Sequence, residues 1–221
     1  MDADGTNLRQ LTDRVSDSQI HPNWSADGGT IAFASSQEGQ YDIFLMTSDG
    51  SQPRRLSGPP VGESSPAQSP DGTKLAFTTD GDFDLVITEV SGSELKPERV
   101  ITNAAQAAWS PEGDEIVFTK LRGRRYWDLY SLNLEEPEPK RLTQSPGMDY
   151  WPTWSPDGAR IAFMRDVDFV RGEGYTTSDL HLLDLISFDI ENLTEKLDLD
   201  VAMQPAWRPE PTRTTQSSSG S

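Results

Sequence analysis

The stretch Trp154-Ser155-Pro156-Asp157-Gly158-Ala159-Arg160-Ile161-Ala162-Phe163 recurs along this chain of 221 residues, and it decides the fold. Its first half returns with substitutions as Trp24-Ser25-Ala26-Asp27-Gly28, Gln68-Ser69-Pro70-Asp71-Gly72 and Trp109-Ser110-Pro111-Glu112-Gly113. A degenerate fifth copy reads Trp207-Arg208-Pro209-Glu210. Self-similarity at a period of 20–50 residues is the sequence signature of solenoids and propellers.

The chemistry of the repeat predicts four short strands in each unit. Pro-Asp-Gly is a turn signal, because Pro presets φ, Asp bonds its own backbone and Gly takes the strained position. This turn separates a strand that ends in Trp-Ser from one centred on Ile-Ala-Phe. An Asp then opens a third strand, and a second turn such as Ser48-Asp49-Gly50 leads to a fourth. Each unit closes on a triplet such as Arg141-Leu142-Thr143.

Apolar runs such as Ile31-Ala32-Phe33-Ala34 do not alternate with polar residues, which indicates strands buried on both faces. A lone four-stranded sheet cannot bury both faces, but copies stacked around an axis can. No segment keeps a helical apolar period for three turns. We therefore predict an all-β fold, a β-propeller of four-stranded antiparallel blades, with four complete blades plus half-blades at both termini.

The repeat also sets the expected boundaries of the propeller domain, residues 1–210. They are a partial blade at 1–12, blades at 13–57, 58–102, 103–143 and 144–194, a partial blade at 195–210, and a disordered polar tail at 211–221. The chain is either a piece of a larger ring or closes by joining its two terminal strands in a fifth blade. An open arc would expose apolar blade faces, so self-association through unpaired terminal blades is the further expectation.

Composition narrows the classes of partner. Nineteen Lys and Arg against 36 Asp and Glu give a net charge of −17, which argues against nucleic acid and against anionic membrane surfaces. There is no cysteine, and only His21 and His181 are available for imidazole ligation. No apolar run approaches the length of a membrane span, so direct membrane insertion is not expected. Met1 is followed by Asp2, Ala3 and Asp4, which does not read as a signal peptide.

The pattern Trp-Ser-Pro-Asp-Gly-x-x-Ile-Ala-Phe, then Asp-Ile-Phe-x-Met-x-x-Asp-Gly, then Arg-x-Leu-Thr, resembles the TolB-type β-propeller repeat, which is WD-repeat-like. The resemblance runs from residue 1 to about residue 210, with Gln68 in place of Trp and Ala26 in place of Pro. It implies a non-catalytic scaffold that binds a protein or peptide, in a periplasmic or otherwise extracytoplasmic location. The same blade occurs in peptidase-associated propellers, so the alternative is the propeller portion of a prolyl-oligopeptidase-like hydrolase lacking its catalytic domain.

Recurrence within the chain separates structural from functional positions. A residue present in every blade has the same structural role each time, whereas a residue found in one blade is a functional candidate. Accordingly, we expect the repeated tryptophans to pack between blades: Trp24, Trp109, Trp154 and Trp207. We expect the repeated third-strand aspartates to bond nearby backbone amides: Asp42, Asp84, Asp128 and Asp179.

Two groups of blade-specific residues form the predicted partner-binding set. Arg122, Arg124, Arg125 and Tyr126 lie in residues 120–127, a segment that is either a solvated loop or a docking patch. His21, Ser65 and Trp151 precede the first-strand prolines, with Gln106 and Gln204 as counterparts, and should ring the mouth of a central channel. Of these we select His21 and Trp151, with the neighbouring Tyr150. An insertion at residues 165–178 is either a binding loop or length variation.

No cofactor or metal is predicted. Residues 80–84 carry carboxylates at alternate positions, as calcium loops do, but Leu85 and Ser91 stand where such loops need Gly and Glu. A plain acidic turn is the simpler interpretation, although a calcium- or glycan-binding propeller remains a third hypothesis. The sequence has no Gly-x-Ser-x-Gly elbow, P-loop or dinucleotide fingerprint, so we expect no enzyme activity from this chain.

Overall fold

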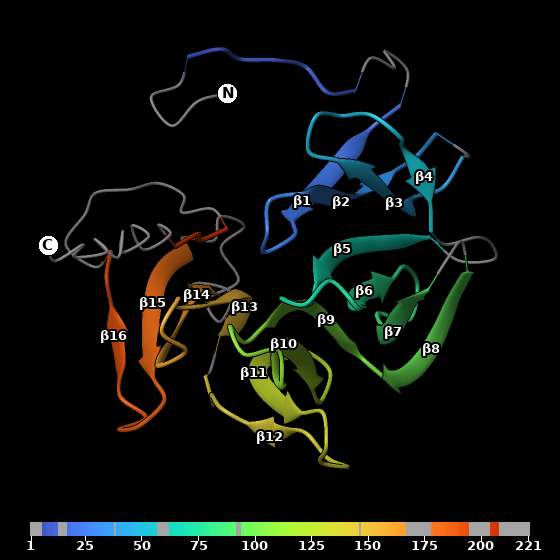
Figure 1. Cartoon of the computed structure of the whole chain (residues 1–221). Helices are drawn as coiled ribbons and strands as arrows, with labels where there is room; N and C mark the ends of the chain where they lie inside the picture. The colour runs from blue at the N-terminus through green and yellow to red at the C-terminus, as the bar shows by residue number, and fades with distance from the viewer. Residues whose placement is uncertain are drawn as a thin grey trace, which may run out of the picture.

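The computed structural model describes residues 6–12, 17–37, 39–56, 62–91, 94–145, 147–166, 178–194 and 204–207. Within them, four antiparallel sheets of four strands follow one another along the chain (Figure 1). Blade 1 contains β1 (Gln19–Trp24), β2 (Thr30–Ser35), β3 (Asp42–Thr47) and β4 (Arg54–Arg55). Blade 2 contains β5 (Glu63–Gln68), β6 (Lys74–Thr79), β7 (Leu85–Ser91) and β8 (Glu94–Ile101). Blade 3 contains β9 (Ala104–Trp109), β10 (Glu115–Arg122), β11 (Tyr126–Asn133) and β12 (Lys140–Arg141). Blade 4 contains β13 (Met148–Trp154), β14 (Arg160–Asp166), β15 (Ser178–Asp184) and β16 (Ile190–Asn192).

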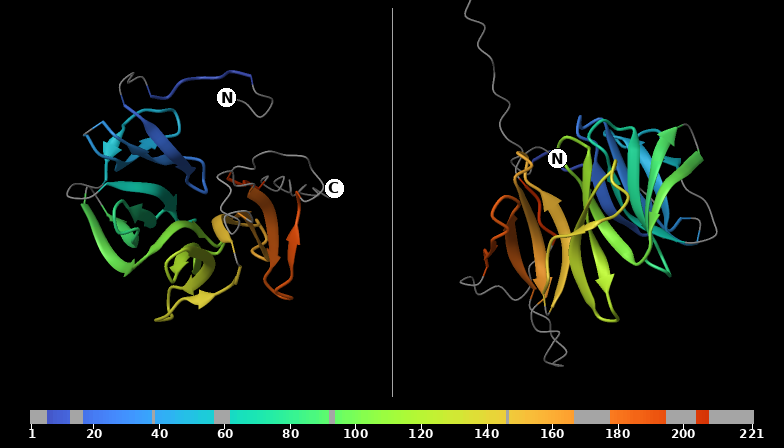
Figure 2. Two further views of the ribbon diagram at one scale, coloured as in Figure 1. Left: turned by 180° about the vertical axis from the view of Figure 1, so that it is seen from behind. Right: turned by 90° about the horizontal axis from the view of Figure 1, so that it is seen from below.

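The sheets are arranged as the blades of a propeller, which confirms the predicted fold class. In every blade the strands hydrogen-bond in sequence order. The first strands β1, β5, β9 and β13 lie innermost along the arc, and the first strands of neighbouring blades contact each other (Figures 1 and 2). The described residues contain no helix of the length and hydropathy needed to cross a membrane. Residues 6–12 and 204–207, the described parts of the two segments predicted as half-blades, belong to none of these strands.

The repeated turn is held by the same hydrogen bonds in blades 1, 2 and 4. In blade 2, Ser69 Oγ donates to Asp71 Oδ1 over 2.6 Å and accepts from the Lys74 amide over 2.9 Å. Asp71 also accepts from the Thr73 amide, and these hydrogen bonds, led by that from Ser69, lower the pKa of its carboxyl to about 2. Gly72 sits at φ +71°, where a side chain is strained. Blade 3 has Glu112 at the acidic position, and there Ser110 bonds Asp114 instead.

The core lies between consecutive blades. Between blades 2 and 3, the second-strand residues Ala76, Ile116 and Phe118 are buried, and they pack with third-strand residues of the same two blades. Similar clusters join blade 1 to blade 2 and blade 3 to blade 4. The central strands are therefore buried on both faces, as the unbroken apolar runs predict.

The repeated tryptophan acts as a clamp between blades. Trp109 Nε1 donates to the Ala67 carbonyl over 3.0 Å, and Trp154 Nε1 donates to the Ala108 carbonyl over 3.1 Å. Trp207 Nε1 reaches the Thr153 carbonyl in the same way over 3.3 Å. Blade 2 replaces the tryptophan with Gln68, whose Nε2 donates to the Asn23 carbonyl over 3.1 Å. The glutamine therefore keeps the bond that the indole makes elsewhere.

Trp24 departs from this pattern. Trp109 and Trp154 are 8% and 9% exposed, whereas Trp24 is 55% exposed. In the other blades this tryptophan packs against the first strand of the preceding blade. No described strand precedes β1, so Trp24 has no such strand to contact. The expectation that Trp24 packs between blades is therefore wrong for the described part of the chain. On the two central strands of blade 1, by contrast, Leu11 packs against the cluster that contains Phe33 and Phe44.

The repeated third-strand aspartates bind mainly side chains of the closing triplet rather than backbone amides. Arg55 pairs with Asp42 over 2.8 Å, and Asn192 Nδ2 donates to Asp179 over 2.9 Å. Blade 2 has Val100 in place of the polar residue, and there Asp84 accepts from the Asn103 amide. The expected backbone bond therefore dominates only where the triplet lacks a polar partner.

Candidate functional site at the channel mouth

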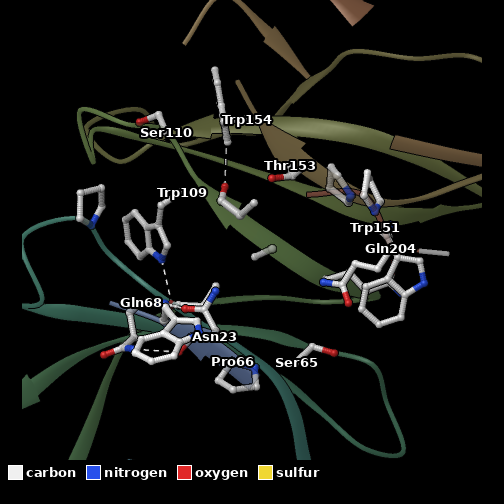
Figure 3. Close-up of a pocket in the computed structure, with 18 of the residues that line it drawn as sticks. Asn23, Ser65, Pro66, Gln68, Trp109, Ser110, Trp151, Thr153, Trp154 and Gln204 are labelled. Atoms are coloured by element: carbon white, nitrogen blue, oxygen red, sulfur yellow. Dashed lines mark hydrogen bonds between the residues drawn. The ribbon is translucent and has the colours of Figure 1, made fainter. Parts of the chain in front are cut away.

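The first strands of all four blades line one cavity of about 490 Å³. It runs from the residues before the first-strand prolines to the Trp-Ser end of each strand. Figure 3 shows Ser65, Trp151 and Gln204 toward one end of this cavity and Trp109, Ser110 and Trp154 toward the other. We call the end that carries Ser65, Trp151 and Gln204 the channel mouth.

One backbone feature repeats around the channel mouth. His21, Ser65, Gln106 and Trp151 have φ between 52° and 56°, in the left-handed region that residues other than glycine rarely adopt. Each coincides with a register shift between the first and second strands of its blade. Such conformations typically cost about 1–3 kcal/mol and persist where the surrounding structure enforces them. The backbone at these positions is the same in four blades, but the side chains are chemically different.

The side chains at the channel mouth contact one another across blades. The rings of His21 in blade 1 and Trp151 in blade 4 have centroids 5.3 Å apart, so two predicted site residues meet across the channel. Ser65 Oγ lies 3.3 Å from His21 Nδ1. Gln106 Oε1 accepts a hydrogen bond from the Trp151 amide over 3.1 Å. Gln204 lines the same cavity and is exposed.

His21 is poised to be neutral near pH 7. Partial burial lowers the pKa of its imidazole below the ordinary value of 6.5, and the charge of Asp80 opposes that effect. A neutral imidazole offers one donor and one acceptor nitrogen, so it can bond a polar group of a ligand without introducing a cation.

The second predicted group, in residues 120–127, is a β-hairpin rather than a loop. Leu121 pairs with Trp127, and Arg122 pairs with Tyr126. Arg122 Nε donates to the buried Asp128 over 2.6 Å, and its guanidinium lies 4.8 Å from the Tyr126 ring centroid. Arg124 and Arg125, at the tip of the hairpin, are exposed. Arg122 thus supports the blade, whereas Arg124 and Arg125 present free charge to solvent.

Tyr150, the remaining predicted residue, faces a second pocket with Phe83 and Trp127. Its hydroxyl bonds Ser178 Oγ. Phe83 was not selected from the sequence. A signal for it exists in the repeat, because the residue before the third-strand Asp is aromatic in three blades: Tyr41, Phe83 and Trp127.

Metal ligation finds no support in the described residues, where no three His, Asp or Glu side chains come close enough to hold an ion. The acidic residues 80–84 therefore carry no metal assignment.

The chain was compared with known proteins. The model of the TolB beta propeller domain matches residues 1–120 and 65–168. A "Protein TolB homolog" from Chlorobium luteolum is 31% identical over 142 residues, which cover 63% of this chain and 32% of that protein. The "Uncharacterized peptidase YuxL" of Bacillus subtilis is 30% identical over 148 residues, covering 64% of this chain and 21% of that protein.

The fold comparison agrees. The crystal structure of TolB from Acinetobacter baumannii superposes with a TM-score of 0.65 at 24% identity, over 80% of this chain and 43% of that one. The chain spans less than half the length of each of these three proteins. With its family model matched over most of its length, the chain belongs to the TolB beta propeller domain family.

Proposed function

We propose that this chain is a non-catalytic propeller that binds a protein or peptide segment at the channel mouth. The observation that carries the proposal is the set of His21, Ser65, Gln106 and Trp151, which share one strained backbone conformation but differ in side chain. The shared backbone conformation belongs to the repeat, whereas the side chains that differ on it are the functional candidates. The fixed backbone presents four different groups to one cavity, as recognition of a specific ligand requires.

The size and chemistry of the cavity support a polypeptide ligand. A volume of about 490 Å³ lies within the range of about 300–1,000 Å³ typical of ligand pockets. Trp151 provides an aromatic surface, and His21, Ser65 and Gln106 provide hydrogen-bonding groups beside it. Arg124 and Arg125 extend the proposed contact surface onto the blade 3 hairpin. A cell-envelope, extracytoplasmic location belongs to the same proposal and rests on the resemblance to TolB-type propellers.

The second candidate is the propeller part of a prolyl-oligopeptidase-like hydrolase. The similarity to a protein described as a peptidase in Bacillus subtilis favours it. The sequence of the parent gene distinguishes the two, since the hydrolase requires a Gly-x-Ser-x-Gly elbow outside these 221 residues. Hydrolysis of proline-containing peptides by the purified chain alone would contradict the non-catalytic proposal.

The test is selection of displayed random peptides on the purified chain, followed by titration of the enriched peptides. We expect Trp151→Ala to weaken their binding about tenfold or more, because a partly buried aromatic at the centre of a site typically dominates binding. His21→Ala should weaken binding less. Phe188→Ala is the control, since Phe188 is an exposed aromatic that does not line the channel cavity. Equal affinity of the selected peptides for Trp151→Ala and wild type would overturn the proposal.

A further inference from the structure

A pocket of about 460 Å³ lies between blades 1 and 2. Its apolar walls are Leu45 of β3 and Leu56, which follows β4, from blade 1, and Val90 of β7 from blade 2. Gln68 and Pro70 line both this pocket and the channel cavity. We call it the inter-blade pocket. It lies in the interface at which the repeat has Gln68 in place of tryptophan.

The walls of the inter-blade pocket correspond to the residues that surround a tryptophan in the next interface. Between blades 2 and 3, one hydrophobic cluster contains Trp109, Ile87 and Ile101, with Leu134 packed against it. In the repeat, the three aliphatic residues of this group align in the same order with the apolar walls of the pocket: Leu45, Leu56 and Val90. Trp109 aligns with Gln68.

The interface between blades 3 and 4 has the same arrangement. The cluster that contains Trp154 has Leu142 and Leu185 packed against it, and these two align with Leu56 and Val90. Two of the three interfaces between the described blades therefore enclose an indole ring between equivalent apolar positions. The third interface has those positions without the ring.

Gln68 reproduces the hydrogen bond of the tryptophan but does not fill its volume. Its Nε2 donates to the Asn23 carbonyl, and its Oε1 accepts from Thr30 Oγ1 over 3.0 Å. Both ends of the amide are therefore engaged by blade 1, and no ring extends from them over the apolar walls. Leu45 is only partly buried as a result, whereas Ile87, its counterpart in the interface that contains a tryptophan, is 1% exposed.

A second departure from the repeat widens the same interface. Blades 2, 3 and 4 have proline before the acidic turn residue, but blade 1 has Ala26. A methyl group added at Gly113 would lie 3.3 Å from Pro70 of the preceding blade, and the corresponding distance between blades 3 and 4 is 3.7 Å. A methyl group added at Gly72 would meet no described atom within 4 Å. Both motif substitutions therefore fall at one interface, and both leave it more open.

We propose that the inter-blade pocket binds one planar aromatic group of the size of indole, where Trp109 and Trp154 place their own rings in the other interfaces. The volume lies within the range of about 300–1,000 Å³ typical of ligand pockets. A ring seated there removes apolar walls from water, as the repeated tryptophans do elsewhere. Asp27 also lines the pocket, and its Oδ1 accepts hydrogen bonds from Ser25 and Gly29, so Oδ2 can accept from an indole N–H.

The ring can arrive as a free aromatic compound or as a tryptophan side chain of a polypeptide, and the experiment separates these sources. The chain is titrated with indole, with N-acetyl-tryptophan methylamide and with N-acetyl-alanine methylamide as the control without a ring. Methyl resonances of Leu45, Leu56 and Val90 report binding, and nuclear Overhauser effects from the ring protons to these methyls locate the ligand. We expect both aromatic probes to bind there and the alanine derivative not to bind.

Each result of the titration has one reading. Binding of indole alone supports a site for a free aromatic compound, and binding of both aromatic probes supports a site that also admits a tryptophan side chain. Absence of binding by both, or Overhauser contacts only to residues outside the inter-blade pocket, would overturn the proposal.

A matched pair of variants sharpens the test. Gln68→Trp places the residue of the other blades in the pocket and should weaken indole binding about tenfold or more, because the added ring occupies the site. Ile186→Trp is the control, since Ile186 is 86% exposed and does not line the pocket. It adds a tryptophan to the chain and should leave indole binding unchanged. Equal affinity of Gln68→Trp and wild type for indole would contradict the assignment.

Ala26→Pro restores the turn of the other blades and should weaken indole binding in the same direction but by less. If Gln68→Trp does not fold, the Ala26→Pro chain and the Overhauser contacts in wild type decide, and unchanged affinity of Ala26→Pro then counts against the proposal. The inference goes beyond the proposed function and fails separately from it. Selected peptides without indole binding would overturn this inference alone, whereas indole binding without any selected peptide would overturn only the proposed function.

Discussion

The two ends of the first strands follow different rules. At the Trp-Ser end, Trp109, Trp154 and even Gln68 make the same bond to the preceding blade. At the channel mouth, the backbone repeats but the side chains differ, since His21 and Trp151 correspond to Ser65 and Gln106 in the other two blades. The Trp-Ser end therefore carries the contacts that stack one blade on the next. The channel mouth carries side chains that stacking does not constrain, and these can recognise a specific ligand.

The largest expected effect tests the constant end. Trp154→Ala removes a buried indole and its inter-blade bond, and truncation of a core Trp typically costs about 3–5 kcal/mol of unfolding free energy. Trp24→Ala changes the same motif position where the side chain is 55% exposed, and it should cost much less. Urea unfolding of both variants measures the difference. Similar losses would show that the motif position, rather than burial, determines its contribution.

The arginines of blade 3 give the next effect. Arg122→Ser leaves Asp128 with one arginine, Arg141, and should cost about 1–2 kcal/mol, because hydrogen bonds to buried charged groups are worth more than neutral ones. Arg124→Ser and Arg125→Ser, on the exposed tip, should each change stability by about 0.5 kcal/mol or less. Thermal and urea unfolding distinguish the two classes. If Arg122→Ser is as stable as wild type, Arg122 does not support the blade and is again a candidate for partner binding.

Gln68 tests whether the contact between neighbouring blades depends on the hydrogen bond to the preceding first strand or on the indole ring. Gln68→Ala removes the bond to the Asn23 carbonyl and should cost about 1 kcal/mol. Gln68→Trp restores the residue found in the other blades and should recover at least part of that loss. If the tryptophan variant is less stable than the alanine variant, the space between blades 1 and 2 is shaped for the amide.

The smallest effect is a pH dependence. Burial lowers the pKa of both His21 and His181 below 6.5 in the folded chain. The unfolded chain therefore binds protons more readily, and stability is fully present above pH 6.5 and decreases as the pH falls below it. Unfolding measured between pH 7.5 and 5.5 should show this loss, and His21→Gln should reduce it. A His21→Gln chain with the same pH profile as wild type would contradict the contribution of His21.

The sequence predicted the recurrent features well, because each rests on local chemistry that repeats. Ser69, Asp71 and Gly72 form a turn from their own side chains and backbone, so spacing alone locates it. The sequence predicts a loop at residues 120–127, because the segment is rich in charged residues and lacks an apolar strand pattern. In the structure it is a hairpin in which Arg122 pairs with Tyr126. The sequence analysis does not select Phe83, because its ring contact with Trp127 and its place in one pocket with Tyr150 join different blades.

What the sequence determined by itself is the blade and its stacking, since turn residues, apolar runs and the repeated tryptophan act over a few residues or on the identical next unit. What only the tertiary structure decided is which variable residues meet. His21 and Trp151 are 130 positions apart in sequence, yet their rings are 5.3 Å apart, because the curvature of the arc brings first strands of blades 1 and 4 to one channel. The pocket lined by Phe83, Trp127 and Tyr150 has the same origin, since these side chains come from three blades. A repeat fixes each contact between neighbours, but contacts across the ring depend on the sum of all the blade angles, which no single motif encodes.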